Sequence, residues 1–592
     1  MRGGTTPGWL PYFAGTIVLI AACAVFAHLG VAVGTLLFAG GPQLLDGLWG
    51  AAEFIITGEA ASIPSETAGA VRITAIVVTI LVVVLLGLAF ALIMRRVARW
   101  KQSEKWFARD LRRREGLARA QEVRQKLGVK TRLKQAKTVR PTLENPKPED
   151  VGVRIGTSDG QPAWLSTEDS VALIGAPRMG KGFRLLIGAI IDWQGPLITT
   201  STRNDNLLAT MAMREKLGKV TVFDPQGLSG VRRSLRISPI EGCQDPLVAM
   251  QRAQAIMGGT ALGASTTNAE WATEAETILS RLLLAAAVSG RDVTALRDWG
   301  AAPALARPAV SILHSEGPAG WGDSLAATLD ADPKLLQSRW MGVSSALAPL
   351  QLPSVAQSMT PTGEDPVFDA EEFLAGANTL YLIGTRSGAG AAGGFLGAVL
   401  DDIVERARRK ALRSPGSRLD PPLGLILDEL ANLFSWRALP TVLSDGGGIG
   451  IWTLVVLQAL SQAETAWSAA EAQTIWSSSI AKILLGGGSD MDYLNDVSSL
   501  LGERKIRRES TTRSFGQEAS WQNDFERVPV ITAAELRRLP EGMGLLAYRN
   551  RRGILLDMPG WIDRPDSAAI KAGMERTKAL QHEGFAAENG VR

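Results

Sequence analysis

Cysteine and histidine are scarce in this chain. Its 592 residues include two cysteines, Cys23 and Cys243, and three histidines. One cysteine lies in a long apolar run and the other in an expected cytosolic loop, so we expect no disulfide between them. The low counts also argue against zinc sites built from clusters of thiolates and imidazoles. The sequence therefore indicates neither a disulfide framework nor a structural zinc.

A strong overall charge is also missing, because the formal net charge is only +4. The charge is nevertheless uneven. Residues 95–140 are rich in lysine and arginine, and only Glu104, Asp110, Glu115 and Glu122 oppose them. We interpret residues 95–150 as a basic juxtamembrane segment whose helix lies near anionic lipid. Contact with nucleic acid is the alternative for this stretch.

Long apolar runs are present at the start of the chain, at about residues 9–38 and 73–94. Each exceeds the roughly 20 residues that a membrane-spanning helix needs. A cleaved signal peptide is the alternative for the first run, but its leading segment carries only Arg2 and the run is too long. We predict a membrane anchor over residues 1–94, with residues 39–72 as an extracytoplasmic loop.

Flanking charges predict the orientation of this anchor. The loop is acidic and has Arg72 as its one basic residue, whereas Arg95, Arg96 and Arg99 follow the second run. Cytoplasmic segments carry the excess of lysine and arginine, so residues 95–592 and the short N-terminus are both expected in the cytoplasm.

The most informative motif follows an apolar run, Val171–Ile174. It has the spacing GxxxxGK and leads into an apolar stretch, 183–191, that is expected to be helical. Strand, glycine-rich loop and helix are the context of a phosphate-binding P-loop, in which backbone N–H groups and a lysine hold the phosphates. The residues expected around the phosphates are Gly175, Ala176, Pro177, Arg178, Met179, Gly180, Lys181 and Gly182.

One position departs from the P-loop pattern. The serine or threonine that usually follows the lysine and binds Mg²⁺ is replaced by Gly182. A simple glycine-rich turn between a strand and a helix is the alternative interpretation of this stretch.

A second motif supports the first. Residues 423–427 are apolar and lead into Asp428 and Glu429, the pattern of a Walker B strand. Asp428 is expected to hold Mg²⁺, directly or through water, and Glu429 to act as general base toward the attacking water. An acidic helix cap after a strand is the alternative. Together the motifs predict ATP and Mg²⁺ as cofactors.

The soluble part alternates short apolar runs with helical patterns, which predicts an α/β domain with a mostly parallel sheet. A length of 592 residues predicts two or three domains. We expect a P-loop domain made of residues 151–243 and 361–565, with an all-helical domain of residues 244–360 inserted between its halves. The tail, 566–592, is expected to be a short helix or disordered. The expected strands are Val171–Ile174, Leu197–Thr200, Val220–Phe223, Thr379–Ile383, Gly424–Leu427, Trp452–Val456, Lys482–Leu485, Leu545–Ala547 and Ile554–Leu556, the last two as an edge hairpin.

Taken together, these features resemble the TraG/TraD-type coupling proteins of type IV secretion. The local matches are the DPQG segment at 224–227, the DELANL segment at 428–433, the strand that ends at Gln458, and the LPEGMG segment at 539–544. A P-loop ending in GKG is also common in that family. The resemblance extends over nearly the whole chain.

The resemblance implies a bacterial inner-membrane, hexameric ATPase with a RecA-like P-loop domain. Its partners would be DNA, relaxase or relaxosome proteins, secretion-channel components and membrane lipids. The DNA would be contacted through its phosphate backbone without sequence specificity, and the relaxase or relaxosome proteins would dock on the inserted helices. Gln458 would sense the γ-phosphate from the end of its strand. Arg386 and Arg504 are the candidates for an arginine finger that acts on a neighbouring subunit.

Two other functions remain open at this point. A double-stranded DNA pump of the FtsK type shares the anchor and the P-loop core, but such pumps lack a large helical insertion between the two motifs. An ATPase that exports polypeptides and never touches DNA is compatible with the modest net charge. A non-catalytic scaffold is disfavoured by the intact Lys181, Asp428 and Glu429.

Overall fold

The computed structural model describes residues 10–231, 235–265, 268–363, 368–385, 392–512 and 520–590. The chain divides into two compact units, Met1–Asp110 and Leu111–Arg592.

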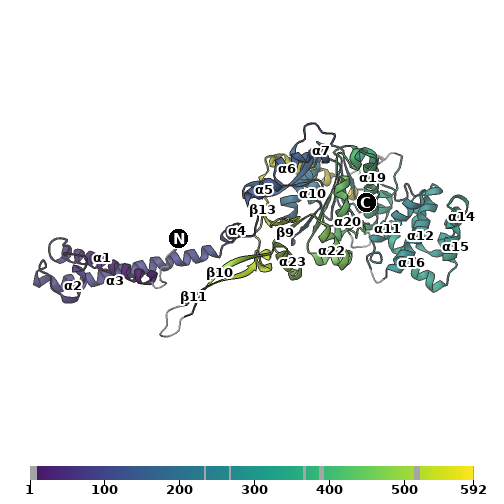
Figure 1. The fold of residues 1–592 in the computed structure, drawn as a ribbon. Helices are drawn as coiled ribbons and strands as arrows, with labels where there is room; N and C mark the ends of the chain where they lie inside the picture. Colours follow the sequence, from purple (N-terminus) through teal and green to yellow (C-terminus); the bar gives the residue numbers. More distant parts are fainter. Residues whose placement is uncertain are drawn as a thin grey trace. The chain divides into compact units, whose positions relative to one another are not determined.

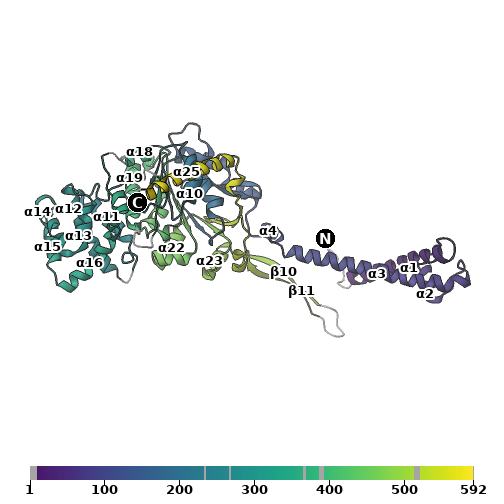
Figure 2. The ribbon, with the colours of Figure 1, turned by 180° about the vertical axis from the view of Figure 1, so that it is seen from behind.

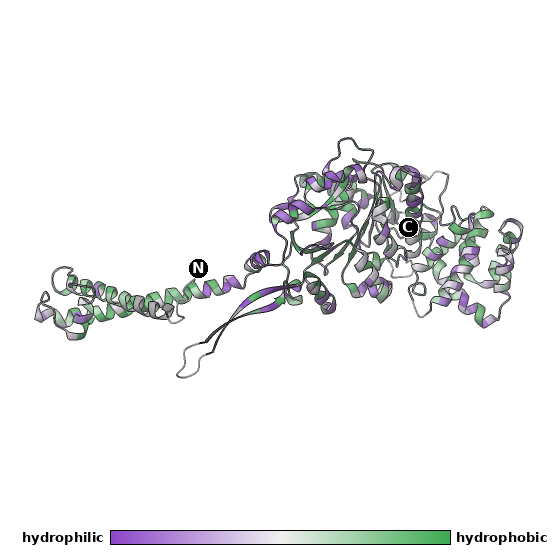
Figure 3. Cartoon of the chain, in the orientation of Figure 1, coloured by the Kyte–Doolittle hydropathy of each residue, from purple (hydrophilic) through white to green (hydrophobic). Residues whose placement is uncertain are grey.

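The first unit holds the two apolar helices, α1 (Leu10–Phe38) and α3 (Ser65–Lys101), with the short α2 (Gly50–Thr57) between them. Figure 3 colours many of their residues as hydrophobic. Within the described residues, both helices contain stretches long and apolar enough to cross a membrane. They pack closely through glycine, since a Cβ on Gly30 would lie 2.6 Å from the carbonyl oxygen of Ala75. Small residues at such contacts are typical of paired membrane helices.

The second unit is built on one large sheet, which has eleven strands among the described residues, in the order β2-β1-β13-β12-β9-β3-β8-β7-β4-β6-β5. The strands from β9 to β5 in this order are parallel, and the other four join antiparallel. Their bounds are β1 Gly152–Ser158, β2 Gln161–Ser166, β3 Val171–Ile174, β4 Leu197–Ser201, β5 Val220–Phe223, β6 Thr379–Ile383, β7 Leu423–Leu427, β8 Ile451–Leu457, β9 Ala481–Leu485, β12 Met543–Tyr548 and β13 Ile554–Asp557.

All nine expected strands are present, and the predicted mostly parallel sheet is confirmed. The predicted position of the last hairpin is wrong. Strands β12 and β13 do pair, but they lie inside the sheet, and β2 forms the edge instead. Strands β1 and β2 had no strong apolar signal, because glycine, serine, threonine and proline interrupt them.

Helices cover the sheet. The first ones after the P-loop are α9 (Ile187–Asp192) and α10 (Asp205–Arg214), and α19 (Gly393–Arg413) follows β6. The core beneath α9 combines its buried Ile190 with residues of several strands and with the stacked rings of Trp193 and Trp452, whose centroids are 5.1 Å apart. Shorter helices complete the unit: α18 Ala370–Ala375, α20 Leu439–Asp445, α21 Leu460–Ala466, α22 Ala469–Ser478, α23 Met491–Leu501 and α24 Ala533–Arg537.

The region between β5 and β6 contains helices and turns but no strand in its described residues, and most of its helices form one group (Figure 1). Its first helix also packs against α19, where Arg252 and Asp402 form an ion pair of 2.9 Å. The α-helices of this group are α11 Pro246–Gly258, α12 Ala269–Val288, α13 Val293–Ala301, α14 Arg307–Glu316, α15 Trp321–Leu329, α16 Pro333–Leu347 and α17 Pro353–Ser358.

The basic segment differs from the expected juxtamembrane helix. After α3 it breaks into α4 (Glu104–Arg113), α5 (Ala120–Leu127), α6 (Val129–Lys134) and α7 (Ala136–Val139), and from Leu111 onward it belongs to the second unit. Three of its arginines are buried in ion pairs with distant acids. These pairs are Arg114–Glu535 at 2.6 Å, Arg132–Asp169 at 3.6 Å and Arg140–Asp420 at 2.6 Å.

The tail is neither short nor disordered in its described part. It forms α25 (Ser567–Gly590), which packs along α10 (Figure 2). Ile570 is fully buried, and Arg564 pairs with Asp192 at 2.7 Å. The tail therefore completes the helical layer over the sheet.

A buried arginine ties the layers together, which gives a stability prediction. The Arg214 side chain is fully buried, and burial lowers its pKa to about 10. Its guanidinium donates to the Thr379 hydroxyl and to the carbonyls of Ile190, Trp193, Gly195 and Ala377. Arg214→Met removes every one of these donors, so we expect the free energy of unfolding to fall by about 4 kcal/mol.

Urea denaturation of the full chain measures this loss. The control is Arg307→Met, because that arginine is 57% exposed and has one surface ion pair, with Asp330. A loss below about 1 kcal/mol in Arg214→Met would mean that water replaces the missing donors.

Candidate functional site

Three neighbouring parallel strands bring the predicted motifs together at their carboxyl ends. Strand β8 lies between β3 and β7, with Ile174 opposite Leu457 and Leu427 opposite Val455. The P-loop follows β3, Gln458 follows β8, and Asp428 follows β7. Carboxyl ends of parallel strands are the usual place for ligand sites in such sheets.

The P-loop conformation depends on residues with positive φ. Gly180 has φ of 77° and Arg178 of 66°. Gly175 is also constrained, since a Cβ there would lie 3.0 Å from the Leu485 side chain. The expected helix follows, with Gly182–Leu186 wound as a π-helical turn that continues into α9.

The ammonium group of Lys181 contacts the backbone of its own P-loop. Its Nζ donates to the carbonyl oxygens of Gly175 at 2.7 Å and Ala176 at 3.2 Å. Burial lowers the pKa of this lysine, whereas Asp428 and Glu429 act in the opposite direction. The ammonium group is thus held inside its own loop, where a phosphate could replace the two carbonyls as its partner.

Asp428 is a partly buried carboxylate held by polar contacts. Asn206 Nδ2 donates to its Oδ2 at 2.9 Å, and the Thr200 hydroxyl donates to its backbone oxygen at 2.9 Å. Burial, and then the charge of Glu429, raise the pKa of Asp428 to about 6. A buried carboxylate with a raised pKa gains from a nearby cation.

Glu429 has a left-handed backbone, with φ of 52°, and its carboxylate accepts a hydrogen bond from Thr202. Non-glycine residues in this region cost free energy and cluster at functional sites. The turn directs the side chain that follows Asp428 toward the loop after β4.

Gln458 is connected to the Walker B segment through a second glutamine. Its backbone N–H donates to Gln462 Oε1 at 3.0 Å, and Gln462 Nε2 donates to Asn432 Oδ1 at 2.7 Å. The residues after β8 and β7 are therefore linked directly by side chains.

The donor set fits a Mg²⁺-nucleotide. A glycine-rich loop with a lysine, a partly buried carboxylate beside a second acid, and nearby amide and hydroxyl groups are what phosphates and a hard cation require. Two of these residues, Thr202 and Asn206, were missed in the sequence. Their signal was the polar run Ser201–Asn206 after a buried strand, but its adjacency to β7 appears only in the folded sheet.

The two arginine-finger candidates stay predictions. Arg386 lies outside the described residues. Arg504 is the second residue of β10 (Glu503–Thr512), which pairs with β11 (Ser520–Pro529) in a separate two-stranded sheet. A role for Arg504 at a nucleotide stays a prediction that requires another subunit.

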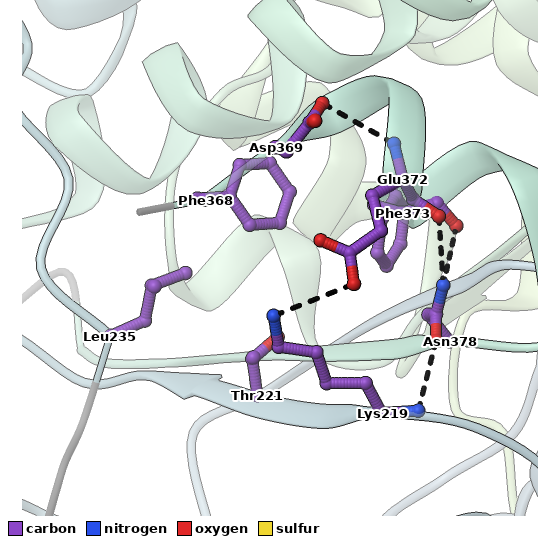
Figure 4. A pocket seen from close by; sticks show the side chains of 8 residues that line it. All are labelled: Lys219, Thr221, Leu235, Phe368, Asp369, Glu372, Phe373 and Asn378. Carbon is purple, nitrogen blue, oxygen red and sulfur yellow. Dashed lines mark hydrogen bonds and ion pairs between the residues drawn. The ribbon is translucent and has the colours of Figure 1, made fainter. Parts of the chain in front are cut away.

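A small pocket lies elsewhere, at the amino end of β5 (Figure 4). Lys219 and Glu372 face each other across it at 3.8 Å, and Phe368 and Phe373 supply an aromatic wall. Because β5 is parallel to its neighbour, its amino end lies where the parallel strands begin, whereas the P-loop lies where they end. This pocket does not contribute to the candidate site.

The burial of Asp428 predicts a pH-dependent stability. Its pKa of about 6 exceeds the value of about 3.9 of an unfolded aspartate, so the native state binds more protons between these values and stability falls as pH rises through them. We expect Asp428→Asn to raise the melting temperature of the nucleotide-free protein at about pH 8, by an amount worth about 2 to 3 kcal/mol, and the gain to shrink toward about pH 4.

Thermal melts of the full chain across this pH range test the effect. Asp496→Asn is the matched control, because Asp496 is exposed on α23. A lower melting temperature for Asp428→Asn at about pH 8 would contradict the assignment of an unfavourably buried charge.

Comparisons with known proteins agree with this geometry. Residues 422–541 match the family model described as "TraM recognition site of TraD and TraG". This range begins just before β7 and includes Asp428, Glu429 and Gln458. Among curated protein sequences, the comparison finds no match.

Solved structures of the conjugative coupling protein TrwB share the fold. The unbound form of the bacterial protein is 18% identical, with a TM-score of 0.51, over 72% of this chain and 91% of that one. TrwB with the GTP analogue GDPNP is 20% identical, with a TM-score of 0.53, over 72% and 92%. TrwB with ADP and Mg²⁺ is 20% identical, with a TM-score of 0.51, over 71% and 91%.

The predicted fold class, a P-loop α/β sheet with an inserted helical region, is confirmed by this likeness. The chain resembles the TraG/TraD coupling proteins in the sequence of residues 422–541, and it shares the fold of TrwB over 72% of its length.

Proposed function

We propose that this protein is a membrane-anchored ATPase that couples a relaxase–DNA substrate to a type IV secretion channel and drives DNA transfer in bacterial conjugation. The proposal is carried by one observation: Lys181, Asp428, Glu429 and Gln458 all follow the carboxyl ends of neighbouring parallel strands, within a fold shared with TrwB. The solved TrwB complexes contain nucleotide analogues, or ADP with Mg²⁺, which supports ATP and Mg²⁺ as the cofactors here.

Each side chain then has a defined task. Lys181 exchanges its two loop carbonyls for the β- and γ-phosphates of ATP, and the loop N–H groups hold the remaining oxygens. Asp428 would hold Mg²⁺, which supplies positive charge against the phosphates when bound. Glu429, aligned by Thr202, accepts a proton from the attacking water.

Loss of the γ-phosphate must be reported to the rest of the ring. Gln458 lies between the P-loop and Asp428, and Gln462 ties its backbone to Asn432. A movement of Gln458 would thus be transmitted through these hydrogen bonds to Asn432, which follows Walker B. In a hexamer, an arginine finger from a neighbouring subunit would complete the site.

The apolar pair α1 and α3 supports a multi-pass anchor in the bacterial inner membrane, with both termini in the cytoplasm. Arg95, Arg96 and Arg99, at the end of α3, remain available to anionic lipid. The family model over residues 422–541 supports a relaxosome-type partner. The inserted helices are a second docking region for such partners, and DNA would be gripped through its phosphates.

The other two functions are less well supported. The helical region between β5 and β6 disfavours the FtsK-type pump, which lacks an insertion there. Protein export without DNA keeps the same ATPase site, so only a DNA-dependent measurement separates it from coupling.

A genetic transfer assay tests the proposal. In donor cells that lack this gene, we expect plasmid transfer to be lost, restored by the intact chain and not restored by Glu429→Gln. Unchanged transfer without the gene would contradict a coupling function.

A further inference from the structure

The P-loop lacks the hydroxyl that normally follows its lysine, and the structure shows another polar group at that place. A Cβ on Gly182 would have a single neighbour within 4 Å, the Oδ1 of Asn206, at 3.4 Å. The oxygen of this amide therefore faces the position from which a serine or threonine at residue 182 would act.

Chemistry fixes the orientation of this amide. Asn206 Nδ2 lies 2.9 Å from Asp428 Oδ2, and an ionised carboxylate can only accept hydrogen bonds. The NH₂ group must therefore point to Asp428, which leaves the amide oxygen on the side of Gly182.

The position of Asn206 is also well supported. It is 3% exposed and belongs to the first turn of α10, which follows β4, the parallel neighbour of β7. The Thr210 hydroxyl donates to the backbone carbonyl of Asn206 at 2.6 Å and also bonds to the Tyr381 hydroxyl at 2.6 Å. The backbone of Asn206 is fixed in this way and its amide is held by Asp428, so the side chain is preorganised for a ligand.

We propose that Asn206 replaces the missing P-loop hydroxyl, its amide oxygen acting as an oxygen ligand toward the Mg²⁺ of the bound nucleotide, beside Asp428. Amide and carboxylate oxygens are the ligand types that hard cations prefer. The inference rests on the proposed function, because it requires that the site binds a Mg²⁺-nucleotide. It also explains how a P-loop ending in Gly182 can retain a metal-binding group.

A double-mutant cycle tests the exchange between the two positions. The affinity of a fluorescent ADP analogue for the full-length protein in detergent is measured with Mg²⁺ and with EDTA. The proteins are the native chain, Asn206→Ala, Gly182→Ser and the double variant. In Asn206→Ala we expect the affinity gain from Mg²⁺ to fall by about tenfold, with the affinity in EDTA unchanged. In the Gly182→Ser background, Asn206→Ala should reduce the affinity gain from Mg²⁺ much less, because the serine hydroxyl can act as the oxygen ligand instead.

Several outcomes would overturn the inference. If Asn206→Ala lowers the nucleotide affinity equally in Mg²⁺ and in EDTA, Asn206 acts on the nucleotide or on the fold. If it lowers the affinity gain from Mg²⁺ equally with Gly182 and with Ser at residue 182, Asn206 merely positions Asp428. If Asn206→Ala does not fold, Asn206→Ser enters the same cycle, because it is polar but too short to reach the site. No nucleotide binding by the native chain would overturn the proposed function as well, whereas normal binding with a full Mg²⁺ effect in Asn206→Ala would overturn this inference alone.

Discussion

Glu429→Gln is expected to bind ATP with nearly native affinity and to hydrolyse it at least about a hundredfold more slowly. The change removes the base without removing the side chain. A glutamine at this position can still accept the hydrogen bond from Thr202, so the turn after β7 should keep its geometry. Single-turnover hydrolysis of radiolabelled ATP, together with an equilibrium binding assay, separates the two steps.

The control for this variant is Glu464→Gln, because Glu464 is exposed on α21. It should turn over ATP at the native rate. Loss of ATP binding in Glu429→Gln would assign Glu429 to nucleotide or metal binding instead of proton transfer.

Lys181→Ala should abolish turnover by a different route. The variant lacks the charge that faces the β- and γ-phosphates, so both binding and hydrolysis are expected to fall, hydrolysis by at least about a hundredfold. Because this lysine is desolvated near two carboxylates, its removal should leave the fold intact, as a thermal melt can show. Steady-state hydrolysis at saturating ATP provides the main readout.

Lys219→Ala is the matched control, since Lys219 lies at the opposite edge of the sheet and is 51% exposed. If Lys181→Ala hydrolysed ATP as well as this control does, the loop at 175–182 would be a structural turn and not the catalytic P-loop.

Much of the sheet could be predicted from the sequence because its parallel strands are short, fully apolar runs such as Val171–Ile174 and Thr379–Ile383. Strands buried on both faces produce that signal. The hairpin strands β10 and β11 had no such signal, because their residues are mainly charged and polar. The tail helix α25 was equally hidden, since its apolar residues are too dispersed to define a face.

The basic segment shows why charge alone is ambiguous. A count of arginines in residues 95–140 predicts a surface facing anionic lipid. The structure instead pairs Arg114, Arg132 and Arg140 with acids that are distant in the sequence, and no local pattern reveals such partners. The same limit applies to Asn206, whose contact with Asp428 depends on β4 lying beside β7.

The most direct test of the central claim is ATP hydrolysis by the full-length protein in lipid nanodiscs, with and without single- or double-stranded DNA, beside Lys181→Ala. A DNA motor built on this P-loop should show turnover that DNA stimulates and that disappears in the variant. Turnover that DNA does not change would contradict a DNA-coupling ATPase and would favour export of polypeptides.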